Sequence, residues 1–561
     1  MSLIIKTPAL VELAQWIVPL TLDEIPQRVQ EKVRYQIINV LASQYASQHH
    51  AGAQALKACV YGWGKTGKCT VIPTGEKMPL HEAVLVNCVN SMALDYDDYL
   101  YMGHTGHSAI VASWALCEEF DLPASDLLLL AVIGNEIGGR LGITTALGPQ
   151  NGQAWSYIHS IAAAAITAKA QNLTVEQTTH AMAIALYQPG FTLWPGFMGA
   201  DSKLLTAANP TVQGIQAAQF AKAGMTGSTD VLDHPTKGFW KYFTYVSVPH
   251  MMGGLGKSWL SDTLTFKKYP GCAYIDTSMD ALFELLENFE TKHGKALNHE
   301  DIAAINITAN FLTVEMDNLS HEYRDESCIQ QTMVNFSIPL NIAIALQTGR
   351  LGGAELNQNN LNKNRETLNK IANKVTLTHD WDMTLYVIDS VNRCMGEQSL
   401  TASLGVKQWR QLINGFRSQL GGKRKHGLNR RQLWSQRRKL LQIIKDRPKL
   451  RGQSPDLGKV DFSQFEMSFP AKVELQLLNG ETLSCRKDVP FGAQAQTNYL
   501  DTVSNKFLQE SEAGKVHREI LDQLEDADTF FNIDINTLSD QICSKPSQTK
   551  YKKETESVIE H

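Results

Sequence analysis

The chain has 561 residues and a formal net charge of −5, with 43% hydrophobic and 19% charged residues. This length exceeds what one hydrophobic core usually organises, so two domains are expected. The charge balance gives no general attraction to nucleic acid or to an anionic membrane, and nucleic acid is not expected as a partner.

Cysteine usage and the apolar segments point to a cytoplasmic protein. The nine cysteines form no C-x-x-C pair, which disfavours a zinc ribbon or a cysteine-ligated iron–sulfur cluster. Lys6 and Glu12 interrupt the amino-terminal apolar residues, and a small-residue cleavage pattern is missing. The most apolar run, Leu127 to Ile133, is far shorter than the roughly 20 residues that span a bilayer. We therefore expect a reducing, cytoplasmic setting and no membrane segment.

Residues 1 to about 260 have the pattern of successive helices. Between residues 23 and 45, apolar positions at three- and four-residue spacing predict one buried helical face. Ser125 or Asp126 is expected to cap the next helix, and Thr174 and Gln177 have the capping-box spacing for another. The alanine-rich run 162–170 suits close helix packing. The first half is therefore predicted to be an all-α domain.

The pattern changes near Lys267. Residues 302–311 and 373–382 contain β-branched or alternating runs, which predict strands. Residues 471–489 predict a hairpin with Asn479-Gly480 at its turn. A helix is expected between the strands at 336–346, and beyond residue 490 the pattern is helical again. The middle of the chain is therefore predicted to be a smaller α+β unit.

A basic segment lies within this unit. From Arg410 to Arg451 the chain has fourteen lysines or arginines and a single acid, Asp446. A solvated insertion on helices is the simpler interpretation, and a patch for nucleic acid, an anionic partner or a second subunit is the alternative. Interspersed apolar residues such as Trp409 and Trp434 indicate that the segment folds or docks.

The strongest functional pattern is a crowd of acids and imidazoles. The segment DYDD, residues 95–98, is followed after a short gap by HTGH, residues 104–107. Both residue types can move protons near neutral pH, and the glycines suit a loop. The sequence therefore predicts an acid/base site here.

Several blocks, in this order, resemble the MmgE/PrpD family. The run SMALDYDDYLYMGHTGHSAIVASWALCEE is similar to that family's D-F/Y-D-D motif, short gap and H-P-G before a helix. Further similar blocks are DSKLLTAANPTVQGIQAAQFAKAGMTGSTDVL, KKYPGCAYIDTSMDAL, VNFSIPLNIAIALQTGR and the VELQLLNG hairpin. The resemblance covers roughly residues 5 to 540 without the basic insertion.

The resemblance implies a mainly α fold, in which a large all-α domain built from both chain ends carries an inserted α+β lid domain. The implied boundaries are 1–266 for the first all-α part, 267–490 for the lid with the insertion at about 401–456, and 491–545 for the return. Residues 546–561 are a polar tail. The resemblance further implies a homodimer and cofactor-free lyase or isomerase chemistry on small carboxylates, with no metal.

Six positions are transferred from the family's motifs. Asp95, His104 and Lys203 match family residues and are expected to be catalytic, although Thr105 replaces the proline of H-P-G and the gap is one residue shorter. At three further positions the family carries histidine, and these are expected to contact substrate: Gln153, Asp276 and Thr206.

This set of residues suits proton abstraction and elimination. A histidine can move a proton near neutral pH, an adjacent aspartate can fix its tautomer, and Asp95 and His104 fit that pairing. Lys203 can bind a substrate carboxylate or donate a proton. Gln153 and Asp276 remove positive charge and add negative charge, which predicts a substrate with fewer carboxylates than 2-methylcitrate, or one that carries an amine or a hydroxyl.

Three functions fit this sequence. The leading one is a lyase, either dehydratase or decarboxylase, with altered specificity. An epimerase or racemase would use the same Asp95, His104 and Lys203. The third is a scaffold that has lost turnover and binds a partner through the basic insertion.

Overall fold

The structure is a computed structural model that describes residues 7–149, 156–400, 404–419, 425–429, 431–432, 434–436, 438, 455–511 and 515–543. Helices dominate these residues, and the longest strands belong to one four-stranded sheet. The mainly α fold predicted from the sequence is therefore confirmed.

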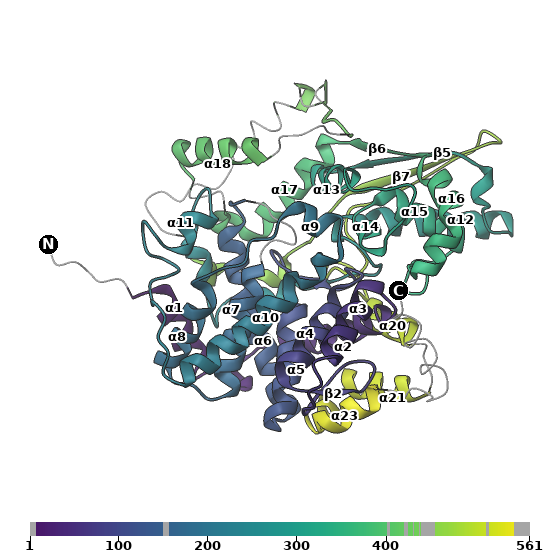
Figure 1. Cartoon of the computed structure of the whole chain (residues 1–561). Helices are drawn as coiled ribbons and strands as arrows, with labels where there is room; N and C mark the ends of the chain where they lie inside the picture. Colours follow the sequence, from purple (N-terminus) through teal and green to yellow (C-terminus); the bar gives the residue numbers. More distant parts are fainter. Residues whose placement is uncertain are drawn as a thin grey trace.

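The first half of the chain is built from helices joined by short loops and two-residue strands (Figure 1). These helices are α1 (Ala9–Ile17), α2 (Gln27–Ala46), α3 (Ala51–Tyr61), α4 (Leu80–Met92), α5 (Gly106–Phe120), α6 (Ala124–Thr145), α7 (Ser156–Ala170), α8 (Val175–Leu186), α9 (Trp194–Met198), α10 (Leu205–Lys222) and α11 (Phe239–Phe243). The short strands are β1 (Cys69–Thr70), β2 (Lys77–Met78), β3 (Asp98–Tyr99) and β4 (Thr265–Phe266).

Helices α7 and α10 pack closely because small residues line their contact. A Cβ added to Gly214 of α10 would lie 2.2 Å from the carbonyl oxygen of Ser160 on α7. This contact needs a residue without a side chain. The close packing predicted from the alanine run is confirmed.

Helix α6 is apolar over 22 residues, and its most apolar window is fully buried. Its length and composition would suffice to cross a membrane, but its surroundings are those of a core helix. It begins at Ala124 after Pro123, so the expected cap at Ser125 or Asp126 is wrong. At α8 the predicted capping box is confirmed, because the Gln177 amide donates to Thr174 Oγ1 at 3.2 Å.

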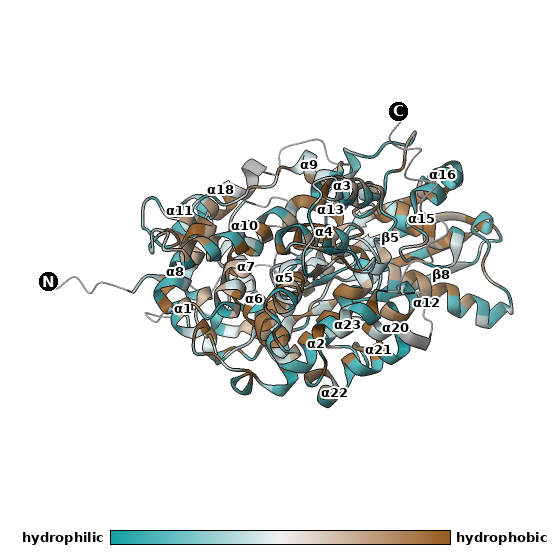
Figure 2. Ribbon diagram, turned by 60° about the horizontal axis from the view of Figure 1, so that its bottom comes forward, coloured by the Kyte–Doolittle hydropathy of each residue, from teal (hydrophilic) through white to brown (hydrophobic). Residues whose placement is uncertain are grey.

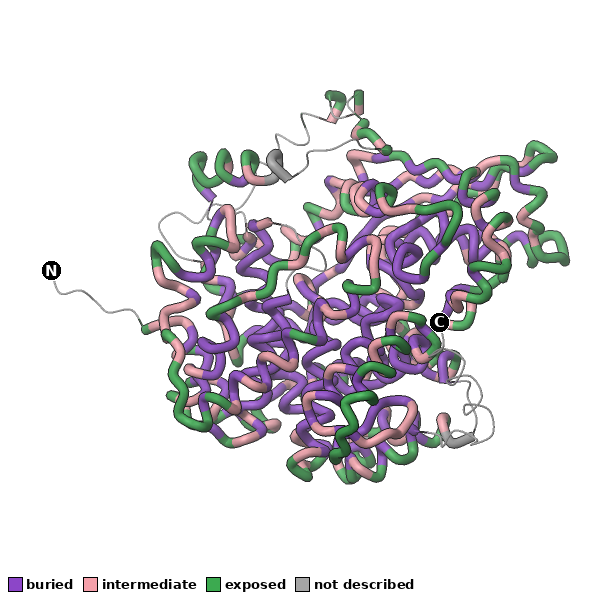
Figure 3. The backbone as a smooth tube through the Cα atoms, in the orientation of Figure 1, coloured by how far each residue is buried: buried purple, intermediate pink, exposed green. Residues whose placement is uncertain are grey.

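The carboxyl-terminal helices complete the same apolar core. Val503 and Phe507 of α20 are fully buried beside residues of α2. In Figure 1 these helices, in yellow, lie beside the purple amino-terminal ones; they are α20 (Asp501–Glu510), α21 (Lys515–Glu525), α22 (Ala527–Phe531) and α23 (Ile535–Ile542). Figures 2 and 3 show apolar, buried residues in the interior of this helical part and polar, exposed turns outside.

The sheet has the order β6-β5-β7-β8. Strand β5 pairs parallel with β6 and antiparallel with β7, and β7 pairs antiparallel with β8 across a turn in which Gly480 has φ +88°. All three predicted strand regions are confirmed, as β5 (Ile302–Ala309), β6 (Val375–His379), β7 (Ala471–Leu477) and β8 (Thr482–Lys487).

One face of the sheet forms a second apolar cluster with helices α12, α15 and α16. The helices of this region are α12 (Asp276–His293), α13 (Phe311–His321), α14 (Gln331–Val334), α15 (Ile338–Thr348), α16 (Gln358–Ala372) and α17 (Trp381–Met395). Ala46, Leu94 and Tyr96 of the helical part also join this cluster, so the domain boundaries drawn from the sequence stay a prediction.

The described part of the basic insertion docks on the rest of the molecule, as expected. Helix α18 (Val406–Gln419) buries Leu412 against Val246 and its neighbours. His426 Nε2 lies 2.8 Å from Asp317 Oδ2 of α13. The Gln432 amide group donates to Asp380 at 2.7 Å. A partner for this insertion stays a prediction.

Candidate active site

Asp95 occupies a sharp turn after α4. Its φ is +54°, a left-handed conformation that few residues other than glycine adopt, and its amide donates to the Met92 carbonyl at 3.0 Å. The side chain is 1% exposed. Asp95 Oδ1 lies 3.4 Å from Lys203 Nζ and 3.6 Å from Lys267 Nζ. The turn therefore directs this carboxylate toward two buried amines.

A short antiparallel ribbon brings Lys267 to the DYDD segment. Strand β3 pairs with β4, and the Lys267 amide donates to the Asp97 carbonyl at 3.2 Å. The Lys267 ammonium then donates to Asp97 Oδ1 at 2.6 Å and to the Asp95 carbonyl at 2.8 Å. Lys267 thus joins the two acids, although they are about 170 residues away in the chain.

Asp97 holds His104. Its Oδ2 lies 2.7 Å from His104 Nδ1. The sequence assigned this role to Asp95, and that pairing is wrong because the left-handed turn directs Asp95 to the amines. Since a carboxylate only accepts hydrogen bonds, Nδ1 of His104 is the donor and Nε2 of the neutral ring keeps its lone pair.

A second layer of histidines lies beneath this contact. His107 Nε2 lies 2.9 Å from Asp97 Oδ2, and its Nδ1 lies 2.9 Å from Ser91 Oγ. His159 lies behind it, with ring centroids 6.1 Å apart, and contacts Ser108 Oγ at 2.9 Å. Burial lowers the pKa of His159 well below its ordinary value, so its neutral form is favoured.

Asp98 has a structural environment. Gln36 donates to it at 2.7 Å and Asn39 at 3.4 Å. Gly106 packs against it so closely that an added Cβ would lie 2.2 Å from its Oδ1. Burial and the nearby Asp97 raise the pKa of Asp98 to about 6. Position 106 therefore requires glycine, because the Asp98 carboxylate occupies the space that a side chain would need.

Lys203 extends into an apolar cage. Its ammonium lies 4.8 Å from the ring centre of Phe336 and 5.7 Å from that of Phe197. The side chain is fully buried, and no hydrogen bond from Nζ to a described residue has acceptable geometry. This amine therefore keeps donor capacity for a bound anion.

Burial and mutual attraction set the charges of the cluster. Burial favours neutral acids, but the charges of Lys203 and Lys267 outweigh it and hold the pKa of Asp95 below its ordinary value. For Asp97, Lys267 and His104 likewise overcome burial and hold the pKa well below its ordinary value. Burial lowers the pKa of Lys203 against the opposing effect of Asp95. The acids are therefore ionised, and the Lys203 proton is easier to transfer than that of an exposed lysine.

The carboxyl-terminal helix α20 supports the site through Lys506. Its ammonium donates to Asn39 Oδ1 at 2.8 Å, to Ser43 Oγ at 3.3 Å and to the Tyr96 carbonyl. It also lies 3.8 Å from the ring centre of Tyr96. One side chain from residue 506 thus fixes the backbone between Asp95 and Asp97.

Replacing Lys506 by methionine is expected to change how stability depends on pH. Burial lowers the pKa of Lys506 to about 7 from the ordinary 10.5. Between these values the folded state binds fewer protons than the unfolded state, so this group adds stability as the pH rises. The free energy of unfolding is measured with urea near pH 7 and near pH 9.5. Its increase between these two pH values should be larger for wild type than for the variant. Equal gains would contradict this, and exposed Lys222→Met is the control.

The other transferred positions have different outcomes. Gln153 lies outside the described residues. Thr206 is buried in the first turn of α10, and its contact with substrate stays a prediction. Asp276 starts α12 and is 1% exposed. Burial, reinforced by Asp280, raises its pKa well above the ordinary value, which favours the neutral form, and its contact with substrate stays a prediction.

Two central residues were missed by the sequence analysis, Asp97 and Lys267. Asp97 belongs to the DYDD segment but was not among the six transferred positions, whereas it contacts Lys267, His104 and His107. Lys267 begins the K-x-Y-P part of the block KKYPGCAYIDTSMDAL. Its position within a block that resembles the MmgE/PrpD family could have identified Lys267 as a site residue.

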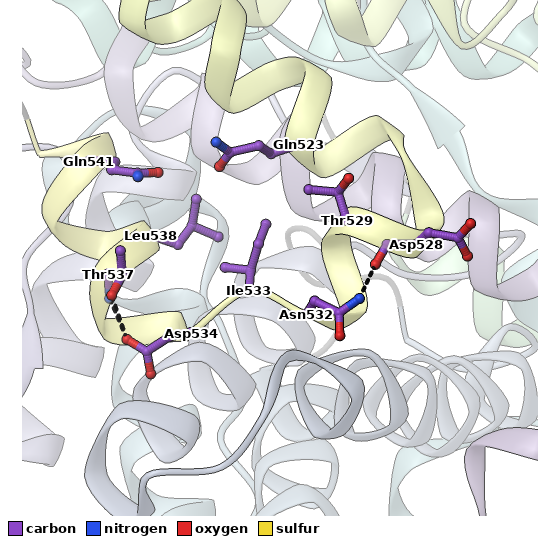
Figure 4. Close-up of a pocket in the computed structure, with 9 residues that line it drawn as sticks. All are labelled: Gln523, Asp528, Thr529, Asn532, Ile533, Asp534, Thr537, Leu538 and Gln541. Carbon is purple, nitrogen blue, oxygen red and sulfur yellow. Dashed lines mark hydrogen bonds between the residues drawn. The ribbon is translucent and has the colours of Figure 1, made fainter.

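A cavity in another part of the described structure does not coincide with this cluster. It measures about 530 Å³ and is lined by residues of α21, α22 and α23 and the turns between them (Figure 4). Two internal hydrogen bonds, Asn532 to the Asp528 carbonyl and Thr537 to Asp534, fix its rim. None of the residues around it belongs to the acid, imidazole and amine cluster.

Comparisons with known proteins agree with the sequence resemblance. Residues 11–249 match the MmgE/PrpD N-terminal domain. A cis-aconitate decarboxylase of Aspergillus terreus strain NIH 2624 / FGSC A1156 is 23% identical over 391 residues, which is 67% of this chain and 79% of the relative. The human cis-aconitate decarboxylase is 28% identical over 206 residues, 35% of this chain and 42% of that protein. The chain therefore has an MmgE/PrpD N-terminal domain and is a distant relative of the cis-aconitate decarboxylases.

Proposed function

We propose that this protein is a cofactor-independent lyase that acts on a small carboxylic acid, with decarboxylation as the favoured reaction. The observation that carries the proposal is the buried cluster in which Asp97 holds His104 while Asp95 meets Lys203. The names of the curated relatives favour decarboxylation over dehydration.

His104 is the proposed proton carrier. Its Nδ1 is held by the Asp97 carboxylate, which leaves Nε2 to take or give a proton. The side chain is 17% exposed, whereas Asp97 behind it is fully buried. His104 is therefore the member of this pair that can reach a ligand.

Lys203 is the proposed anchor for a substrate carboxylate. It is a buried amine with unused donor capacity, and charge-assisted hydrogen bonds to a carboxylate are strong in such surroundings. Lys267 is already held by Asp95 and Asp97, so we assign it a positioning role. Binding and proton transfer are thus assigned to different residues.

The step can be written for an acid whose leaving carboxylate is one carbon away from a double bond. The carbon–carbon bond to that carboxylate breaks, and its electron pair forms a new double bond. The electrons of the old double bond take the Nε2 proton of a His104 ring that is protonated before the step, the ring becomes neutral, and carbon dioxide leaves. The cluster lowers the barrier by holding the remaining carboxylate and by delivering the proton.

Purified full-length protein incubated with small unsaturated and hydroxy acids in heavy water tests the proposal. A decarboxylase releases carbon dioxide and gives a product with one deuterium, which NMR detects. Deuterium in recovered substrate without loss of carbon dioxide or water would instead identify an epimerase. Binding of these acids without any conversion would contradict the lyase and favour a scaffold.

A further inference from the structure

Two buried polar groups near His104 lack hydrogen-bond partners. Tyr99 is 4% exposed and Asp276 is 1% exposed. Within the described part of the chain, neither the Tyr99 hydroxyl nor either oxygen of Asp276 has a partner. Most buried polar groups are hydrogen-bonded, so groups without a protein partner are candidates for contact with a ligand.

Phe469 connects these groups in space. Its ring centre lies 6.2 Å from that of Tyr99, and the Tyr99 ring lies 6.0 Å from His104. Its carbonyl accepts a hydrogen bond from Thr277 Oγ1, and Thr277 directly follows Asp276. Tyr99 and Asp276 therefore lie around the same residue, and the Tyr99 ring also lies near His104.

The surroundings of Asp276 favour its neutral form. Burial is the main cause, and Asp280, one helical turn later, acts in the same direction. The opposing charges come from Lys267, which is already bound to Asp95 and Asp97, and from Lys506, which is bound to backbone and amide oxygens. A neutral carboxyl and a phenol can each donate one hydrogen bond and accept another.

This pair suits some ligand groups better than others. Among the described residues, a second substrate carboxylate would meet no cation with unused donor capacity beside Asp276, and burying an unpaired charge is costly. An ammonium group would be repelled by Lys267 and Lys506. An uncharged group that both donates and accepts would satisfy both side chains.

We propose that Tyr99 and Asp276 form a specificity subsite that binds an uncharged hydrogen-bonding arm of the substrate, such as a hydroxyl or a carboxamide. This inference rests on the proposed function, because the substrate's carboxylate would be held at Lys203. The substrate is then an acid with one arm that is polar but not ionised.

Calorimetry with two small acids tests the subsite. Succinate has two carboxylates, and succinamate replaces one of them by a carboxamide. Full-length wild-type protein is expected to bind succinamate about tenfold or more tightly than succinate. Asp276→Asn keeps an uncharged hydrogen-bonding group and should keep this preference. Asp276→His should shift the ratio of the two affinities toward succinate by about tenfold.

Tyr99→Phe gives a second, milder test. It should weaken succinamate binding by about three- to tenfold through loss of one hydrogen bond and leave succinate unchanged. Tyr101→Phe is the matched control, because Tyr101 follows on the same segment and packs on Phe465 at 4.9 Å. It should not change either affinity.

The outcomes separate this inference from the proposed function. If wild type binds succinate as tightly as succinamate, or if Asp276→His does not change the preference, the subsite is overturned and the lyase stands. If Lys203→Met binds both acids like wild type, the carboxylate anchor is wrong. Wild type that binds neither acid at millimolar concentration contradicts the proposed function and the inference with it.

Discussion

Replacing Lys203 by methionine is expected to lower turnover by about 10²- to 10³-fold, because one preorganised donor to the substrate carboxylate is lost. The flexible methionine can occupy the same cage of Phe197 and Phe336. Asp95 keeps Lys267 as a counter-charge, so the protein should stay folded. The substrate acid is first identified by its conversion in heavy water. The rates of wild type and variant, measured over a range of concentrations of that acid, then check this result.

Lys222→Met is the control for that variant. Lys222 ends α10, the helix that begins two residues after Lys203, and is exposed, so its loss should leave the rate within about twofold of wild type. A folded Lys203→Met protein with wild-type kcat and KM would show that the Lys203 amine takes no part in the reaction.

Replacing Asp97 by asparagine is expected to have the second large effect, a loss of about 10²- to 10⁴-fold in turnover. An amide cannot accept from Lys267, His104 and His107 in the way that an ionised carboxylate does. Turnover should fall with little change in KM, because Asp97 contacts His104, whereas the proposed carboxylate anchor Lys203 pairs with Asp95. Removing one member of a buried charge pair should also destabilise the fold by about 3–5 kcal/mol.

Asp98→Asn provides the matched comparison. It makes the same chemical change one residue later, at an acid whose pKa is already raised to about 6 and which contacts only neutral amides among its described hydrogen-bond partners. It should cost about 1–2 kcal/mol of stability and leave kcat within about threefold of wild type. If both variants lose turnover to the same extent, Asp97 does not control His104.

Local patterns predicted the elements well where local energies decide them. The capping box at Thr174 and the turn at Asn479-Gly480 were found because each satisfies its own backbone groups. The cap of α6 was assigned to Ser125 or Asp126, whereas Pro123 itself occupies the position before the helix. Where the domain boundaries lie could not be decided locally, since Tyr96 packs with residues of the second cluster.

The site was predicted less completely because its geometry depends on distant residues. The motif indicated Asp95, His104 and Lys203, but spacing alone does not show which acid faces the imidazole. That choice follows from the left-handed turn at Asp95 and from the ribbon that delivers Lys267. The neutral form of Asp276 likewise follows from burial and from Asp280, which only the folded chain reveals.

The contact of Lys506 with the Tyr96 carbonyl has a consequence for how the protein matures during translation. The DYDD segment emerges from the ribosome early, yet the residue that fixes its backbone is made about 400 residues later. A growing polypeptide can pack its first helices but cannot complete this cluster. The cluster is therefore complete only after α20 has been synthesised and has packed on α2.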